Sequence, residues 1–153
     1  MDNYQIITLI IISASALYGG FRLIKTKDLF ANTICGIQIL AIIITFSGFQ
    51  SLLQIGFHML LLATFLAVIY SVYKTKHSVK KRAVLLSISI PLFVGYLFKA
   101  LHLSGIDAIN FFMIIPIIAF VMALVDRNTY KNELGFISIL SAEALIRAIG
   151  III

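Results

Sequence analysis

The feature that most constrains this chain is a stretch of 45 residues, from Leu29 to Tyr73, that contains no Asp, Glu, Lys or Arg. As one helix it would be about 68 Å long, about twice the thickness of the hydrocarbon layer of a membrane. The stretch therefore has to fold back on itself. Turn-compatible residues gather near its middle at residues 47–51, which predicts two spanning helices at about 29–46 and 51–73.

The composition extends this prediction to the whole chain. Of the 153 residues, 61% are hydrophobic and 12% are charged, whereas soluble proteins have roughly 45–50% and 25%. Since about 20 residues cross a membrane, too few remain for a catalytic domain in water. The sequence predicts an all-α fold, a single transmembrane domain over residues 1–153. It is an integral membrane bundle of six helices, at about residues 3–21, 29–46, 51–73, 83–101, 106–125 and 134–153.

Three parts of this topology leave alternatives open. The first segment is also compatible with a secretory signal, but Asp2 precedes it and the basic residues follow it, which is the reverse of a signal's order. The last segment either spans the membrane or lies flat in the interface. Three helices on each side of Lys76 would also allow an inverted repeat. Pro91 and Pro116, near the middle of the fourth and fifth segments, predict a kink in each.

The basic residues predict an orientation. The loops after the first, third and fifth segments, including residues 74–82, hold ten of the twelve Lys and Arg residues. Positive loops stay in the cytoplasm, so both termini are expected outside, in a multi-pass protein of the bacterial inner membrane. Because the positive charge sits in short clusters between apolar runs, the expected partners are the lipid bilayer and its anionic headgroups rather than nucleic acid. Other membrane-protein subunits are a further expected partner.

Glu143 and Arg147 are the sharpest candidates for function. Glu143 lies nine residues after Leu134, about 14 Å into a hydrocarbon layer about 30 Å thick. Arg147 follows one turn later on the same helix face. The two residues are either a structural ion pair that holds the last helix in the bundle, or a site at which a carboxylate exchanges a proton or binds a cation.

A polar stripe marks the third predicted helix. Gln50, Gln54 and His58 recur every four residues, so they share one face and descend from the outer surface into the membrane. They could line a wet vestibule and belong to the same polar site as Glu143. The alternative is that they hydrogen-bond to neighbouring helices and only help packing.

A short segment at the end of the fourth predicted helix resembles a known family. The segment reads Phe98-Lys99-Ala100-Leu101-His102-Leu103-Ser104-Gly105. It is similar to the Phe-Lys-x-x-His-x-Pro-Gly segment between the two spanning helices of the L subunit of the gliding-motility and type 9 secretion motor of Bacteroidetes and its relatives. The resemblance extends over about residues 95–125 and implies a helical hairpin within a proton-driven membrane complex.

The resemblance is incomplete where the family carries its chemistry. Ser104 replaces the proline of the motif, and no acidic residue lies between Asp107 and Asp126, where the family has one in its second helix. Lys99 and His102 are therefore also interpreted more simply, as a pair that anchors the helix end at the outer headgroups.

Three hypotheses for function follow. The first is a small subunit or interaction protein of a membrane assembly. The second is a small proton, cation or solute transporter that uses Glu143 and Arg147, and the third is an intramembrane enzyme. The sequence has no zinc-protease motif, nucleophile elbow or phosphate loop, and Cys35 is its one cysteine. No enzymatic activity, metal site or cofactor is therefore predicted.

Overall fold

A computed structural model describes residues 3–47, 49–104 and 106–152 of the chain. All regular structure in this part is helical, without a strand, which confirms the predicted all-α class. The helices are α1 (Asn3–Lys25), α2 (Leu29–Phe46), α3 (Gln50–Tyr73), α4 (Val79–Ala100), α5 (Ile106–Phe111), α6 (Ile114–Val125) and α7 (Leu134–Ile152).

Several helical segments are long and apolar enough to cross a membrane. By length and composition the described residues contain five of them, namely Tyr4–Lys25, Leu29–Phe46, Leu52–Tyr73, Val79–Ala100 and Ala108–Val125. The exposed surface agrees with a lipid environment, because large side chains such as Leu17, Ile43 and Phe111 are exposed on it. In water, apolar patches on this scale would be costly.

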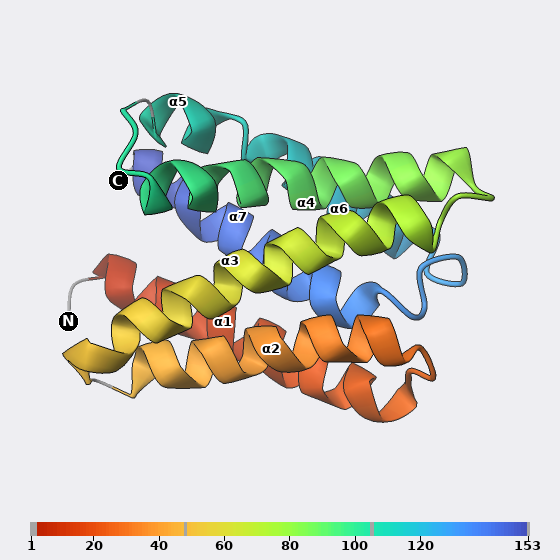
Figure 1. Cartoon of the computed structure of the whole chain (residues 1–153), viewed down its shortest axis with the longest axis horizontal. Helices are drawn as coiled ribbons and strands as arrows, with labels where there is room; N and C mark the ends of the chain where they lie inside the picture. Colours follow the sequence, from red (N-terminus) through yellow and green to blue (C-terminus); the bar gives the residue numbers. More distant parts are fainter. Residues whose placement is uncertain (1–2, 48, 105, 153) are drawn as a thin grey trace.

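The helices form a bundle with two distinct ends (Figure 1). One end, here called the basic end, holds the connections at residues 26–28, 74–78 and 126–133. The other, the terminal end, holds the start of α1, the ends of α2, α4 and α7, and the starts of α3 and α5. The chain therefore runs back and forth between the two ends of the bundle.

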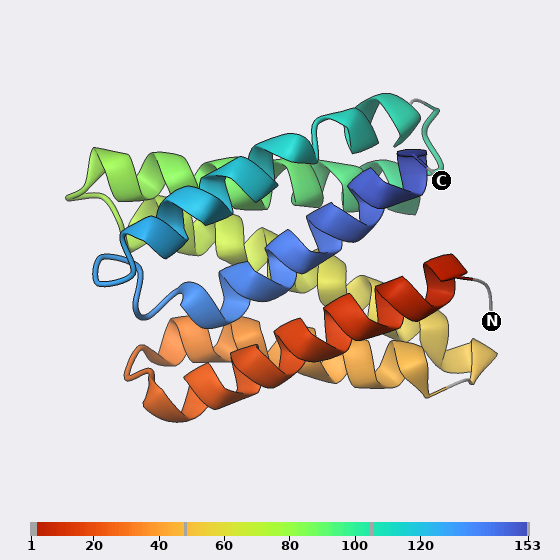
Figure 2. The same cartoon turned by 180° about the vertical axis from the view of Figure 1, so that it is seen from behind.

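The core of the bundle is α7. It contacts α1, α2, α4, α5 and α6, and Figure 2 shows it running diagonally between α1 and α6. Residues 134–142 are all buried. Because α7 is enclosed by other helices, it is part of the bundle. This argues against the alternative in which the last segment lies flat in the membrane interface. α3, its equivalent in an inverted repeat, packs mainly on α2 and α4, so the two halves are not alike in packing.

The start of α4 differs from the prediction. Residues 79–82, expected in a solvated loop, form its first turn. The reason is a cap, because the Ser78 hydroxyl accepts a hydrogen bond from the backbone N–H of Lys81 at 3.3 Å, which satisfies an otherwise unpaired donor at the helix start. The basic side chains of this turn are thus held on a rigid element.

The predicted segment at residues 106–125 is recovered as the candidate span Ala108–Val125. It is not one unbroken helix, since Phe112 and Met113 form a turn between α5 and α6. Pro116 explains the position of the break. It has no N–H for the carbonyl of Phe112, four residues earlier, and its ring crowds that carbonyl. The N–H groups of Phe112 and Met113 turn instead to carbonyls three residues back. At Pro91, by contrast, α4 stays helical throughout.

Close helix contacts depend on glycine at a few positions, most tightly between α2 and α3. A Cβ added to Gly56 would overlap the Thr45 hydroxyl oxygen and lie 3.1 Å from the Ala41 carbonyl oxygen. Gly36 on α2 differs, because a Cβ there would have no heavy atom within 4 Å. The α2 and α3 backbones thus approach closely at Gly56 but not at Gly36.

Gly56→Ala should therefore destabilise the bundle by about 1–3 kcal/mol, the usual cost of overpacking. Gly36→Ala is the matched control and should be neutral or stabilising by up to about 1 kcal/mol, the gain in helix propensity. Thermal unfolding of both variants in one detergent measures the difference. Equal unfolding temperatures would show that the α2 and α3 backbones are not in contact at Gly56.

Candidate functional site

Glu143 and Arg147 form an ion pair in the second half of α7. The Arg147 Nη2 group donates a hydrogen bond to Glu143 Oε1 at 2.7 Å, and the two side chains are 18% and 12% exposed. Their spacing of one turn puts both groups on one helix face, in the favourable order of acid before base. Each charge is thus neutralised within its own helix, and no second helix has to supply a counterion.

The Arg147 side chain also ties α7 to α4. Its guanidinium carbon lies 4.5 Å from the centre of the Tyr96 ring, in a cation–π contact. Gly95 makes room for it, because a Cβ at this position would lie 2.6 Å from Arg147 Nη1. Met113, at the break between α5 and α6, borders the same space, with its Cε 3.2 Å from that added Cβ. The break between α5 and α6 thus borders the space that holds the Arg147 guanidinium, here called the arginine pocket.

Aromatic rings connect this pocket to the terminal end. The Tyr96 and Phe57 ring centres are 5.4 Å apart. Phe57 in turn lies 5.6 Å from the His58 ring and 5.5 Å from Lys99 Nζ. A row of contacts therefore runs from Arg147 through two aromatic rings to His58 and Lys99.

The residues at the end of this row line a cavity of about 510 Å³, here called the outer cavity. Gln54, His58, Lys99 and His102 are among them, so the structure brings the polar stripe of α3 together with the Lys99–His102 pair. The outer cavity holds one ammonium and two imidazole groups, and its described lining has no carboxylate. Its chemistry suits an anion or a carbonyl oxygen better than a cation.

Glu143 does not belong to the outer cavity that the polar stripe lines. Gln54 and His58 are exposed on α3, and His58 Nδ1 lies 2.6 Å from the carbonyl oxygen of Gln54 in its own helix. Phe57 and Tyr96 lie between them and Arg147. The side chain of Gln50 lies outside the described residues. The predicted site is thus two sites, a closed ion pair and an open cavity.

His102 has a backbone conformation that few residues other than glycine adopt, with φ of 51°. It follows the end of α4. The N–H of His102 donates to the Lys99 carbonyl at 3.3 Å, and the N–H of Leu103 donates to the Phe98 carbonyl at 2.9 Å. This pattern usually uses glycine, and another residue costs about 1–2 kcal/mol. Histidine adopts this conformation more often than most residues do, and here its side chain lines the outer cavity.

A second group of charges, at the basic end, was missed by the sequence analysis. The Tyr70 hydroxyl contacts two carboxylates, Glu133 Oε1 at 2.6 Å and Asp28 Oδ2 at 3.0 Å. Lys81 Nζ lies 2.9 Å from Glu133 Oε1, and Lys74 Nζ lies 3.8 Å from Asp28 Oδ2. This basic-end cluster joins α3, α4 and the two connections that precede α2 and α7.

Both carboxylates of the cluster occupy the position just before a helix. Asp28 caps α2 through hydrogen bonds from the N–H groups of Phe30 and Ala31, and Glu133 directly precedes α7. Glu133 is 1% exposed, and its Oε2 has no hydrogen-bond partner among the described residues. The sequence did carry a signal for these two positions, namely an acidic residue immediately before an apolar segment. Negative charge is favourable at the start of a helix.

Two further groups of the connection before α7 have shifted pKa values. A hydrogen bond from the Thr129 hydroxyl and the nearby Lys80 ammonium, 3.4 Å away, lower the pKa of Asp126. Burial raises the pKa of Tyr130, and the negative charges of Asp126 and Glu133 raise it further. Asp126 is thus ionised and directed toward α4.

The described residues contain no group of three or more His, Cys, Asp or Glu side chains that could hold a metal ion. Cys35 is buried and unpaired. Comparisons of the chain with protein-family models, curated proteins and solved structures found no match. The resemblance of residues 98–105 to the motor subunit therefore stays a prediction.

Replacing Glu143 by Gln should lower the unfolding free energy by about 3–5 kcal/mol, because it leaves Arg147 buried without a counterion. Changing both residues, Glu143→Leu with Arg147→Leu, should restore stability to within about 1 kcal/mol of the wild type or above it. Unfolding of the three proteins in detergent checks this. A double variant less stable than the single one would show that the pair does more than neutralise itself.

Tyr70→Phe should cost about 1.5–3 kcal/mol, the value of a hydrogen bond to a charged group. Tyr73, three residues later and 73% exposed, provides the control, since Tyr73→Phe should change stability by less than about 0.5 kcal/mol. Chemical unfolding in mixed micelles measures both. If the two variants behave alike, the hydroxyl of Tyr70 does not hold the basic-end cluster together.

Proposed function

We propose that this chain is a small multi-pass membrane protein that acts as a subunit or interaction protein of a membrane assembly. The observation that carries the proposal is the closed state of the Glu143–Arg147 pair. Its charges bind each other at 2.7 Å, and the arginine packs on Tyr96 of α4. The intramembrane charges thus serve to fix α7 in the bundle, which leaves the outer surface of the helices for contacts with other membrane components.

The proposed topology has six spans with the basic end in the cytoplasm of a bacterial cell and both termini outside. Ten of the twelve Lys and Arg residues belong to the basic connections and their flanking helix turns, which favours this side. α7 supports the sixth span because it runs from the basic end to the terminal end among the other helices. The similarity of residues 98–105 to a subunit of a membrane motor is compatible with this role.

Transport is the second candidate, and one observation favours it. The outer cavity gathers His58, Lys99 and His102, and the rings of Phe57 and Tyr96 connect it to Arg147. A movement of these two rings would open a path from the outer cavity to the ion pair. In this case Glu143 would exchange a proton, or the pair would open to bind a solute.

One pair of experiments separates the two candidates. Purification in a mild detergent from the native membrane should give a complex larger than the 17.0 kDa chain, by light scattering and native mass spectrometry. The double variant Glu143→Leu with Arg147→Leu should retain that complex, because its role is internal to the fold. A strictly monomeric protein without cross-linked partners would contradict the assembly proposal.

The transport candidate is tested on the same variant in proteoliposomes. Wild-type protein should show no proton or cation flux above that of protein-free vesicles if assembly is its function. Flux that the folded double variant loses would instead establish transport through the pair. Lys76→Gln, an exposed change in the connection before α4, is the control and should leave flux unchanged in either case.

A further inference from the structure

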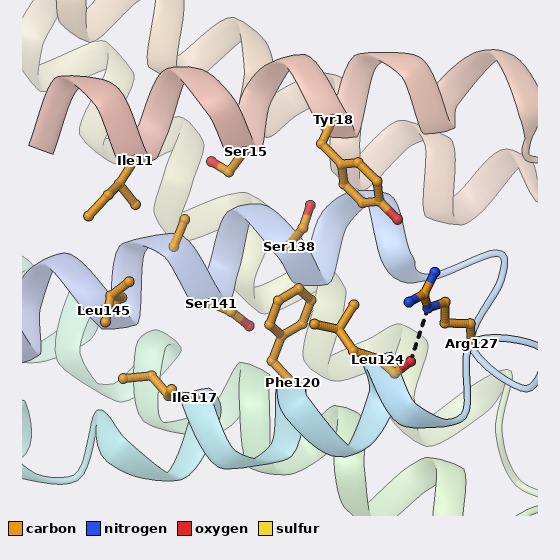
Figure 3. A pocket seen from close by; sticks show the side chains of 11 residues that line it. Ile11, Ser15, Tyr18, Ile117, Phe120, Leu124, Arg127, Ser138, Ser141 and Leu145 are labelled. Atoms are coloured by element: carbon orange, nitrogen blue, oxygen red, sulfur yellow. Dashed lines mark hydrogen bonds between the residues drawn. The ribbon is translucent and has the colours of Figure 1, made fainter. Parts of the chain in front are cut away.

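A groove runs along the outside of α7 between α1 and α6, with a volume of about 500 Å³. Both helices pack on α7, and its small residues Ser138, Ser141 and Ala142 form the floor. Figure 3 shows Ile11 of α1 and Ile117 of α6 among the side chains that line it, on opposite sides of α7. We call this hollow the α1–α6 groove.

The basic end of the groove is positively charged. Arg127 lines it there, and its Nε donates a hydrogen bond to the Leu124 carbonyl at 3.2 Å, which fixes the position of the guanidinium. Figure 3 shows the guanidinium and the Tyr18 hydroxyl pointing toward one another across this end. Arg127 has no carboxylate ion-pair partner among the described residues.

The surrounding charges reinforce this polarity. The Arg22 side chain, one turn beyond Tyr18 on α1, donates to the backbone carbonyl of Lys131, in the connection before α7. The nearest acidic residue in sequence, Asp126, is engaged by Lys80 and Thr129 on the α4 side. The basic end of the groove therefore carries a guanidinium that no described carboxylate neutralises, which suits a phosphate.

One polar atom inside the groove lacks a partner. Ser138 donates its hydroxyl to the Gly135 carbonyl at 2.7 Å. The hydroxyl oxygen of Ser141 is buried, with the residue 4% exposed, and has no hydrogen-bond partner among the described residues. A buried hydroxyl without a partner costs free energy, but this oxygen is covered by its neighbours, so the charged end of the groove carries the argument for an occupant.

The lining of the groove favours a phospholipid, because mostly apolar walls lead to a guanidinium that no described carboxylate neutralises. An acyl chain would lie along the apolar lining, with the phosphate at Arg127. A guanidinium binds phosphate through two parallel hydrogen bonds.

We propose that the α1–α6 groove binds one anionic phospholipid, with an acyl chain along the small residues of α7 and the phosphate on Arg127 and Tyr18. The site is separate from the Glu143–Arg147 pair and from the outer cavity. It stands whether the chain acts in an assembly or in transport. Bound there, the lipid lies over α7 between α1 and α6.

The test uses delipidated protein in detergent, titrated with palmitoyl-oleoyl phosphatidylglycerol or phosphatidylcholine and followed by native mass spectrometry. One phosphatidylglycerol should bind at least about fivefold more tightly than phosphatidylcholine, as expected for one or more nearby cations. Arg127→Gln, in an exposed connection, should weaken phosphatidylglycerol binding about fivefold or more. Lys76→Gln removes the same charge at the same end outside the groove and should change it little.

A second pair of variants tests the acyl chain. Ser15→Phe places a ring in the groove from α1 and should abolish the tight site, whereas Ser13→Phe adds the same bulk on the side of α1 that faces α2 and should not. Equal effects of Arg127→Gln and Lys76→Gln, or full binding by Ser15→Phe, would overturn the proposal. So would light scattering that shows a dimer of wild-type protein which Ser15→Phe alone converts to a monomer, because the occupant would then be a second copy.

Discussion

Burial of α7 in the centre of the bundle depends on cancelling the charges that this helix carries. An isolated carboxylate or guanidinium at this depth would be costly, and Glu143 and Arg147 avoid that cost by binding each other at 2.7 Å. The contact between Arg147 and the Tyr96 ring then orients α7 against α4. Gly95 is part of the same arrangement, because any larger residue would overlap the guanidinium.

The start of α7 is held in a similar way but by different chemistry. Glu133 binds Lys81 and Tyr70, and Tyr70 also reaches Asp28 before α2. Helices α2, α3, α4 and α7 therefore meet in one cluster at the basic end, while the ion pair fixes α7 nearer the terminal end. Between these two polar anchors the helix contacts are apolar and depend on small residues for their closeness.

Particular residues show where prediction from sequence succeeded and where it failed. The bounds of α2 and the pairing of Glu143 with Arg147 follow from uninterrupted apolar runs and from helical spacing. The break at Phe112 was not predicted, because proline in a spanning helix is compatible with either a kink or an interruption, and the surrounding packing selects one. His58 was grouped with Glu143 because both are polar and intramembrane, yet Phe57 and Tyr96 lie between them.

The sequence by itself indicated a membrane environment and determined the approximate position of the helices, since both depend on local composition and on the periodicity of apolar residues. Contacts between helices depend on which faces meet, and the apolar residues of a spanning helix surround it on all sides, so the pattern does not mark the inner face. Tertiary structure alone decided that α7 lies at the centre, that Asp28 and Glu133 share Tyr70, and that a groove with Arg127 at its mouth remains between α1 and α6.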